Sequence, residues 1–356
     1  MRIEEQEYTK NFDIRIWKRV LPFLKPFKKT VAVIVIFNLT CSLVDIAMPL
    51  FQRYAIDTFI EQKTLDGIWK FGLVYFLVVG FQFLSVVLFT RGSASLEMYL
   101  GKTMKRACFV HLQELSFSYY NVTPVGYILS RVMSDTDRIA GMVAWNLTDM
   151  MWALVYVLGV FAAMLALNWK LALIIMSIVP ALAVLTWYFQ NKILRWNRKV
   201  RKINSRIISG YNEGIMGAQT SKTLVIEEKN LGEFQEVTEE MRTAAIRAAR
   251  LSAVYVPLVL FCGSLATAIV VGKGGQMVLD NLLMIGTLSA FTSYAVGIFE
   301  PIQQLARNLA ELISIQANIE RVTTLLDQKP TVKDSPEVVE KYGDTFHPKK
   351  ENWEPI

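Results

Sequence analysis

The sequence of 356 residues is poor in the side chains on which most metal and acid–base sites depend. It holds two histidines, His111 and His347, and three isolated cysteines, Cys41, Cys108 and Cys262. Zinc sites need Cys or His ligands at close, repeated spacings. The sequence therefore predicts no metal centre, and the cysteines are predicted to be small apolar packing residues.

A phosphate-binding loop is also absent from the sequence. The motif G-x-x-x-x-G-K-[ST] needs a glycine-rich loop between a strand and a helix. Residues 101–103 read Gly-Lys-Thr, but Leu96 stands where the first glycine should be, and no strand pattern precedes it. No apolar run ending in Asp indicates a Walker B strand. We therefore do not expect this chain to hydrolyse ATP alone.

Charge is scarce as well: 19% of residues are charged and 53% are hydrophobic, whereas soluble domains have about 25% charged residues. The charges are confined between apolar runs, and a run of roughly 20 residues can cross the hydrocarbon core. The first run is interrupted by Asp45 and Arg53. Six spans are predicted, at about residues 30–57, 69–90, 142–167, 170–190, 251–272 and 281–300.

The net charge of +7 allows two interpretations, a nucleic-acid partner or a membrane orientation. With both termini in the cytoplasm, all but five of the 38 Lys and Arg residues lie on the cytoplasmic side, as the positive-inside rule requires. The sequence therefore favours a multi-pass membrane protein with cytoplasmic termini and no nucleic-acid partner. The five exceptions are Arg53, Lys63, Lys70, Lys170 and Lys273.

Two stretches on the predicted cytoplasmic side, residues 91–141 and 191–250, are far longer than the predicted outer loops. Each is predicted to continue its spans as helix and to turn around residues 119–126 and 210–217. At 1.5 Å per residue, such arms reach roughly 40 Å below the membrane. The predicted fold class is an all-α integral membrane protein with six long helices and two extended cytoplasmic helical hairpins.

The two ends of the chain differ in character from the middle. Residues 12–28, within a predicted elbow segment 1–29, read as an amphipathic segment along the inner membrane surface; a disordered basic tail is the alternative. Regular apolar positions favour the first interpretation, and Pro22 and Pro26 exclude one continuous helix. Residues 328–356, after a membrane domain at 30–327, are predicted to be a linker. The apolar positions are Phe12, Ile16, Trp17, Leu21 and Leu24.

Three segments resemble the transmembrane domain of ABC exporters. Residues 115–135 read LSFSYYNVTPVGYILSRVMSD, with "LS", two aromatics, a polar turn, a glycine, "SR" and a later Asp. Residues 299–330, with FEPI, ANIERV and LDQKP, are similar to the end of span six in that family, and residues 212–224 look like the second hairpin turn. Within the first segment, we expect Arg131 and Asp135 to form an i,i+4 ion pair.

The resemblance implies one half of an exporter that packs as a domain-swapped dimer. In the family, the hairpin tips form coupling helices on nucleotide-binding domains, here at 119–128 and about 209–220. ATP and Mg are then expected only in those domains, which this chain lacks, and this chain binds neither. The alternative role for the tyrosines is packing within the hairpins. The implied coupling residues are Tyr119, Tyr120, Asn121, Pro124, Gly126, Tyr211, Glu213 and Gly217.

The resemblance also bears on partners and location. We expect the chain to be a truncated piece of a longer protein, with a separate ATPase polypeptide as the alternative. Residues 217–230 look most like bacterial multidrug members that pair with a different half, so a heterodimer is slightly favoured over a homodimer. The implied location is the bacterial cell (inner) membrane, and the implied substrate is a small amphipathic or hydrophobic molecule.

Polar and aromatic residues within the spans are candidates for a substrate pathway. Ionisable residues in a membrane are costly, which makes them functional candidates; hydrogen bonding to a neighbouring span is the alternative. Aromatic residues in spans are also packing or interface anchors. Pro49, Pro180, Pro257 and Pro301 are predicted kinks. The candidates are Asp45, Gln82, Asp149, Trp152, Tyr156, Tyr255, Phe291, Tyr294, Phe299 and Glu300.

Together these features predict an ATP-driven exporter that works by alternating access. The alternative is a membrane sensor or an intramembrane enzyme. An enzyme needs a nucleophile, paired acids or metal ligands on facing spans, and neither histidine lies in a predicted span.

Overall fold

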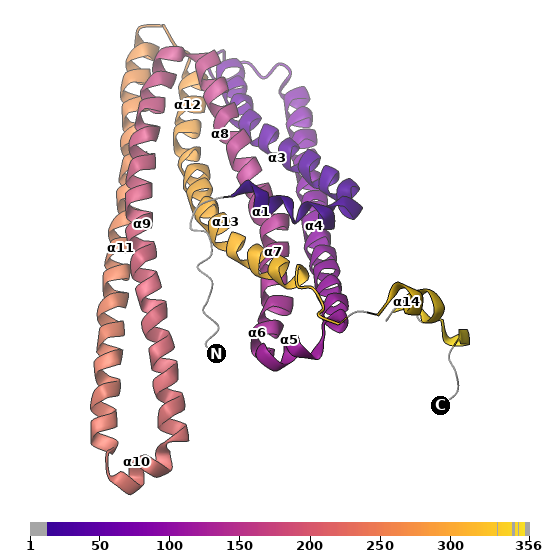
Figure 1. Ribbon diagram of the computed structural model, residues 1–356. Helices are drawn as coiled ribbons and strands as arrows, with labels where there is room; N and C mark the ends of the chain where they lie inside the picture. Colours follow the sequence, from indigo (N-terminus) through magenta and orange to yellow (C-terminus); the bar gives the residue numbers. More distant parts are fainter. Residues whose placement is uncertain (1–12, 333, 344–345, 348, 353–356) are drawn as a thin grey trace. The chain divides into compact units, whose positions relative to one another are not determined.

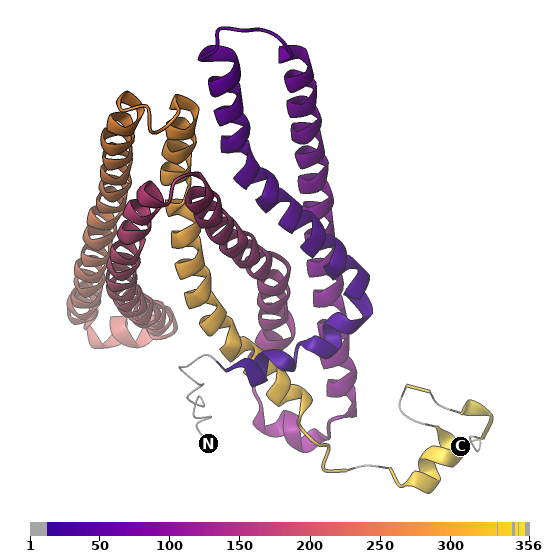
Figure 2. The same cartoon turned by 90° about the horizontal axis from the view of Figure 1, so that it is seen from above.

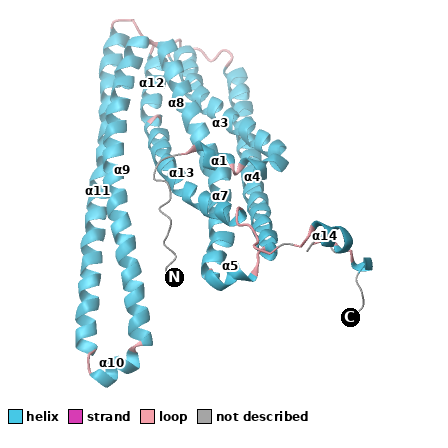
Figure 3. Cartoon of the chain, viewed as in Figure 1, coloured by secondary structure: helices cyan, strands magenta, loops and turns pink. Residues whose placement is uncertain are grey.

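The computed structural model describes residues 13–332, 334–343, 346–347 and 349–352. Within these ranges the chain is helical and forms no β-strand (Figure 3). The all-α prediction is therefore confirmed for the described residues. Residues 1–12 of the predicted elbow segment, including Phe12, lie outside them.

The chain divides into two compact units that are each built from separate parts of the sequence. Unit 1 comprises Met1–Asp45, Trp69–Tyr156 and Arg307–Ile356. Unit 2 comprises Ile46–Ile68 and Val157–Ala306. Each unit is described by itself below.

Five helical stretches are long and apolar enough to cross a membrane, which supports a multi-pass membrane protein. They correspond to the first five predicted spans. The stretches are Ile14–Ile60, Ile68–Glu114, Val125–Leu167, Trp169–Met216 and Glu227–Leu279.

The predicted sixth span is divided between two helices. Helix α12 (Ile285–Gly297) ends one residue before α13 (Phe299–Leu326) begins. Pro301 has no N–H to donate to the carbonyl of Gly297, so a continuous helix would lack that hydrogen bond. A kink was predicted at Pro301; the structure instead interrupts the helix at Ile298, and Pro301 lies in the first turn of α13, which continues to Leu326. The 13 residues of α12 alone are too few for a span.

The described part of the N-terminal segment is ordered rather than a disordered tail. Helices α1 (Ile14–Lys18) and α2 (Leu21–Leu24) and the short 3₁₀ turn η1 (Lys25–Phe27) lead into α3 (Lys28–Ala55). The carboxylate of Asp13 accepts a hydrogen bond of 2.8 Å from the backbone N–H of Arg15 and caps α1. The prolines fall at the starts of α2 and η1, where a missing N–H is tolerated.

The first predicted hairpin is present in unit 1 (Figure 1). Helix α4 (Ile68–Glu114) descends as one helix, and the chain turns at α5 (Phe117–Val122). The ascending arm begins with α6 (Val125–Ser130) and continues without interruption to the next span. This arm also contains the π-helical turns η3 (Arg131–Asp135) and η4 (Met142–Asn146), and helices α7 (Thr136–Gly141) and α8 (Leu147–Leu167).

The second predicted hairpin is present in unit 2. Helices α9 (Trp169–Met216) and α11 (Glu227–Leu279) lie side by side (Figures 1 and 2), and the short α10 (Ala218–Leu224) joins them. The helix break was predicted near residues 210–217, but it begins only at Gly217. Interior glycines cost a helix only about 1 kcal/mol each, so α9 continues through them.

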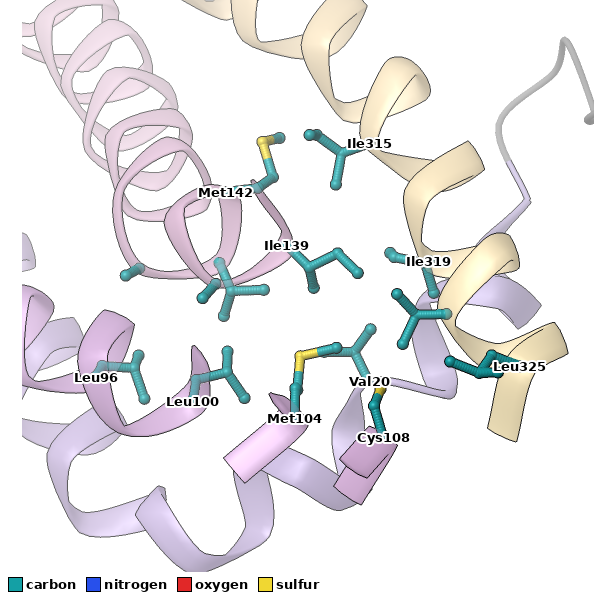
Figure 4. Packing of buried hydrophobic residues seen from close by; sticks show 14 of the residues in the cluster. Val20, Leu96, Leu100, Met104, Cys108, Ile139, Met142, Ile315, Ile319 and Leu325 are labelled. Atoms are coloured by element: carbon teal, nitrogen blue, oxygen red, sulfur yellow. The ribbon is translucent and has the colours of Figure 1, made fainter. Parts of the chain in front are cut away.

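The α4 residues that belong to the buried core of unit 1 lie beyond the apolar stretch of this helix. Leu100 and Met104 of α4 face Ile139 of α7, and Ile319 of α13 closes the cluster (Figure 4). By contrast, only 6% of the most apolar window of α4 is buried within the chain. The apolar stretch of α4 therefore presents exposed apolar side chains that suit contact with lipid. The part of α4 beyond this stretch packs against other helices of unit 1.

An ion pair between distant segments stabilises this core. The guanidinium of Arg321 on α13 donates two hydrogen bonds of 2.7 Å each to the carboxylate of Asp135, whose side chain is only 3% exposed. The expected pair between Arg131 and Asp135 is therefore wrong. These residues occupy a π-helical turn, which has more residues per turn, so positions i and i+4 no longer lie one above the other. Arg131 lies instead over the ring of Tyr127, 4.0 Å from its centroid.

The predicted linker 328–356 contains a short helix that the sequence analysis missed. Helix α14 (Pro336–Tyr342) begins after Ser335, whose hydroxyl caps the N–H of Val338. Before it, the hydroxyl of Thr331 lies 2.6 Å from that of Ser116 at the first hairpin turn. Residues 333, 344–345, 348 and 353–356 of the linker lie outside the described ranges.

In unit 2, a hydrogen bond joins the turn after α3 to the start of α12. The carboxylate of Asp57, in the π-helical turn η2 (Ile56–Ile60), accepts a hydrogen bond of 2.7 Å from the backbone N–H of Gly286. A Cβ atom at Gly286 would lie 2.4 Å from this carboxylate and 2.4 Å from the carbonyl oxygen of Arg53. Only glycine fits this close approach.

Gly286→Ala is therefore expected to lower the free energy of unfolding by about 1–3 kcal/mol, because overpacking displaces the two backbones. The measurement is denaturant unfolding of the purified protein in detergent micelles. Gly275→Ala on α11 is the matched control, since nothing lies within 4 Å of a Cβ there. Equal stability of the two variants would contradict the close packing at Gly286.

Candidate functional site

Three residues predicted for the substrate pathway meet in unit 1. Asp45 lies on α3, Gln82 on α4 and Trp152 on α8. The amide of Gln82 donates to one carboxylate oxygen of Asp45 at 2.7 Å, and the indole N–H of Trp152 donates to the other at 3.0 Å. The structure thus brings together side chains that are more than 100 residues apart in the sequence. We call these three residues the Asp45 cluster.

An aromatic pair adjoins the Asp45 cluster. The rings of Trp152 and Tyr156 are stacked, with centroids 5.4 Å apart and an interplanar angle of 16°. The hydroxyl of Ser42 contacts the backbone carbonyl of Trp152 at 3.4 Å. These contacts fix the orientation of the indole that binds the carboxylate.

The charge of Asp45 is not balanced by a basic side chain. Within the described residues, no Lys, Arg or His forms an ion pair with it. Its two hydrogen-bond donors are neutral and orient the carboxylate without cancelling its charge. A carboxylate without a basic partner inside an apolar run is a chemical arrangement that attracts cations.

The other predicted pathway residues are separate from the Asp45 cluster or buried. In unit 2, Phe291 and Tyr294 of α12 are fully buried, and the hydroxyl of Tyr294 donates to the carbonyl of Ile46 at 2.6 Å. Phe299 is also buried, and Tyr255 of α11 packs on Phe189 with ring centroids 5.7 Å apart. These aromatic side chains fit the packing alternative.

Two acidic candidates differ from Asp45 in their surroundings. Asp149 lies in the first turn of α8, one turn before Trp152. Glu300 is exposed in the first turn of α13. As defined above, the Asp45 cluster contains a single acid, Asp45, which accepts hydrogen bonds from Gln82 and Trp152.

At the first hairpin turn, the predicted coupling residues divide into packed and exposed positions. Tyr119, Tyr120 and Asn121 lie on α5, Pro124 caps α6, and Gly126 lies on α6. The rings of the two tyrosines meet edge to face, with centroids 5.6 Å apart. Tyr119 packs against the core of unit 1, where burial raises the pKa of its hydroxyl above the ordinary value, opposed by the nearby charge of Arg131.

The sequence analysis missed the exposed apolar side chains of this turn. Phe117 is 85% exposed, Val122 69% and Val125 76%. Their signal was present in the sequence as apolar residues on either side of a polar turn. Together these three residues form the first apolar tip, which is suited to contact another protein surface.

The second hairpin turn has the same character. Tyr211 lies on the last turns of α9 and packs edge to face on Phe234 of α11, with centroids 4.9 Å apart. Glu213 lines an open pocket of about 440 Å³ between these two helices. Gly217 joins α9 to α10, and its hydrogen bond to the carbonyl of Glu213 is 2.8 Å long. The strongly exposed side chains of Ile215, Met216 and Val225 form the second apolar tip.

The described part of the chain contains no candidate metal site. There, no group of three or more His, Cys, Asp or Glu side chains could hold a metal ion. The features that stand out are instead the Asp45 cluster and the two apolar tips.

Comparison with known proteins identifies a family that matches most of this chain. Residues 31–302 match the family described as ABC transporter transmembrane region. The ABC transporter ATP-binding protein YknV of Bacillus subtilis, itself uncharacterized, is 26% identical over 330 residues, which cover 91% of this chain and 54% of that protein.

Two further relatives carry names that describe an activity. The ATP-dependent lipid A-core flippase of Desulfotalea psychrophila is 24% identical over 333 residues, covering 91% of this chain and 56% of that protein. A multidrug efflux ATP-binding/permease protein of Mycobacterium bovis is 24% identical over 310 residues, covering 86% of this chain and 26% of that protein. The chain spans little more than half the length of the first of these relatives.

The family match covers most of the chain, and it contains the Asp45 cluster and both hairpins. The predicted resemblance to ABC exporters is confirmed by this match and by the relatives. The chain is a membrane protein with several apolar helices, and it belongs to the family of ABC transporter transmembrane regions.

Proposed function

We propose that this chain is the membrane-spanning half of an ATP-driven exporter that moves amphipathic or hydrophobic compounds out of the cytoplasm or the inner leaflet by alternating access. The observation that carries the proposal is the pair of apolar tips at the ends of the long helical hairpins. Exposed apolar side chains are costly in water unless a partner covers them. In this family, that partner is a nucleotide-binding domain, which also holds ATP and Mg.

The topology belongs to the same proposal. Both termini and both tips lie in the cytoplasm of a bacterial cell, which follows from the positive-inside rule. Helix α12 and the first part of α13 together form the sixth span. Two such halves close the pathway as a dimer, and a heterodimer is slightly favoured over a homodimer.

The proposal gives the exposed and the packed residues of the two hairpin turns different tasks. The exposed side chains of the two tips contact the nucleotide-binding domains. The packed tyrosines, among them Tyr120, whose hydroxyl donates to the carbonyl of Leu112, stiffen the turns that carry those side chains. A stiff turn transmits a displacement to its helices, whereas a mobile turn would absorb it.

The experiment uses the protein in its full length, or together with its ATPase partner, in lipid. We expect ATP turnover that amphipathic compounds stimulate. Phe117→Ser combined with Val125→Ser is expected to abolish stimulation while the membrane domain stays folded, since these side chains are exposed. The control is Leu279→Ser. Leu279 is exposed and lies at the end of α11 that is farthest from the second apolar tip. No ATP hydrolysis in any such assembly would contradict the proposal.

For substrate contact, the proposed pathway includes the Asp45 cluster, and Asp45→Asn is expected to weaken transport of a cationic amphiphile about tenfold or more. The reason is that asparagine keeps the shape but removes the charge that attracts the cation. The measurement compares the export of a permanently cationic dye with that of a neutral dye of similar size. Asp66→Asn, in the exposed loop before α4, is the control. Equal loss for both dyes would show that Asp45 supports structure rather than selectivity.

A further inference from the structure

A basic pocket lies between α9 and α11 in unit 2, and none of its lining residues belongs to the Asp45 cluster or to either apolar tip. Its volume is about 560 Å³. Five of the side chains that line it are basic and none is acidic. The lining residues are Lys192, Arg195, Trp196 and Lys199 of α9, with Arg247, Arg250 and Leu251 of α11.

The spacing of the basic residues explains why they converge. Lys192, Arg195 and Lys199 recur at intervals of three and four, so they share one face of α9. Arg247 and Arg250 are three apart on α11 and share a face in the same way. Because the two helices pack side by side, these two faces border one pocket.

The pocket stands at the border between apolar and polar surface. Residues 171–191 of α9 carry no charge, and Lys192 follows directly. Residues 251–272 of α11 carry none, and Arg250 precedes them directly. If both helices cross a bilayer, the pocket lies in its headgroup layer.

The positive charge of the pocket is poorly balanced. Lys199 pairs with Glu240 at 3.2 Å, and this carboxylate also pairs with Arg206 at 2.8 Å. In the described part of the chain, Arg195 and Arg250 form no ion pair. Like charges held this close repel one another, and an anion between them would remove the repulsion.

Aromatic rings contact three of the five cations. The ammonium of Lys199 lies 5.8 Å from the ring centroid of Trp196. The guanidinium of Arg247 lies 5.0 Å from the ring centroid of Trp196, and the ammonium of Lys192 lies 4.4 Å from that of Tyr188. Such contacts orient the basic groups without neutralising them. The pocket is therefore a positive site whose side chains are partly organised before any ligand arrives.

On the membrane side of the pocket, the surface is apolar. Val184 and Trp187 of α9 are 66% and 68% exposed, and Val254 of α11 is 54% exposed. A ligand that fits both parts has an anionic head and a hydrocarbon tail. Inorganic phosphate or a nucleotide would use only the charged part.

We propose that this basic pocket binds the phosphate headgroup of an acidic phospholipid, whose acyl chains lie on the apolar surface of α9 and α11. The inference requires only that these helices span a membrane, and it stands or falls independently of transport. Basic clusters at a membrane surface gain about 1 kcal/mol per Lys or Arg from anionic lipid.

The test removes two unpaired charges, in the variant Arg195→Gln with Arg250→Gln, from the full chain purified in a neutral detergent. Phosphatidylglycerol, phosphatidylcholine or inorganic phosphate is added, and bound lipid is counted by native mass spectrometry alongside the Tm. We expect phosphatidylglycerol alone to bind and to raise the Tm. The double variant is expected to bind it about tenfold or more weakly, since two charges are lost.

The matched control is Lys222→Gln with Lys229→Gln, which removes the same charge near the second apolar tip. It is expected to bind phosphatidylglycerol like the unchanged protein. A second pocket variant, Lys192→Gln with Arg247→Gln, should reproduce the first and covers the case in which one variant folds poorly. Equal weakening in pocket and control variants would overturn the proposal, as would an equal response to inorganic phosphate. It would also be overturned if the pocket variants changed only the oligomeric state of the chain.

Discussion

Asp135→Ala is expected to lower the free energy of unfolding by about 3–5 kcal/mol. The substitution leaves the guanidinium of Arg321 without the carboxylate that accepts both of its 2.7 Å hydrogen bonds. Arg321, whose side chain is 28% exposed, keeps its hydrogen bond of 2.6 Å to the side-chain oxygen of Asn318 but loses the opposite charge that offset its desolvation. Unfolding of the purified protein in mixed micelles, followed by far-ultraviolet circular dichroism, measures the change.

The control is an exposed ion pair on the same hairpin. Lys105 and Asp137 are 2.7 Å apart, and their side chains are 31% and 60% exposed. Lys105→Ala is expected to cost less than about 1 kcal/mol, because solvent screens this pair. Replacing both members of the buried pair by leucine should cost far less than Asp135→Ala, since no charge is left unpaired. A double leucine variant as unstable as Asp135→Ala would contradict this account.

Leu100→Ala is expected to destabilise unit 1 by about 2–5 kcal/mol, since the removed methyl groups leave a cavity that the neighbouring helices fill only in part. Leu100 is 0% exposed and packs within the core shown in Figure 4. This part of α4 lies beyond the apolar run, so its burial gains the full hydrophobic effect. Denaturant unfolding in micelles is again the measurement.

Leu77→Ala, on the same helix, is the matched control. Leu77 is 60% exposed within the apolar run of α4, so hydrocarbon surrounds it in folded and partly unfolded chains alike. We expect a change of less than about 1 kcal/mol. If Leu77→Ala proved as harmful as Leu100→Ala, the distinction between the lipid-facing and core-forming parts of α4 would be wrong.

Local sequence patterns were sufficient to predict most of the helices. Long runs without charge, and the absence of proline from residues 91–114, predicted α4 as one helix that continues past the membrane. Pro301 predicted a kink near the junction of α12 and α13, but the interruption itself lies at Ile298. The end of α9 was less predictable, because Gly210, Gly214 and Gly217 all lie near it and each costs a helix about the same.

Long-range pairing could not be predicted in the same way. Asp135 and Arg321 are 186 residues apart, and nothing in either local pattern selects the other as partner. The expected local pair with Arg131 failed because a π-helical turn cannot be recognised from residue spacing. Helix α14 was missed for a different reason: its seven residues are too few to show helical periodicity.

The candidate site was predictable as single residues but not as an arrangement. Asp45 stands out because it interrupts an apolar run, whereas Gln82 and Trp152 are ordinary members of theirs. Phe291 and Tyr294 are predicted pathway residues, and both are fully buried within the chain, so their contribution to a pathway stays a prediction. In a helix that is apolar on every side, the sequence does not show which side faces neighbouring helices and which faces a cavity.

The core of unit 1 has a consequence for biosynthesis. The core residues Leu100 and Met104 of α4 are synthesised more than two hundred residues before Ile319 and Leu325 of α13, which belong to the same cluster. Until then, side chains such as Leu100 and Met104 lack the neighbours that α13 provides. Late closure of this kind exposes an intermediate to aggregation and proteolysis. Chaperone supply during membrane insertion should therefore limit the yield of this protein more than the insertion of its individual helices.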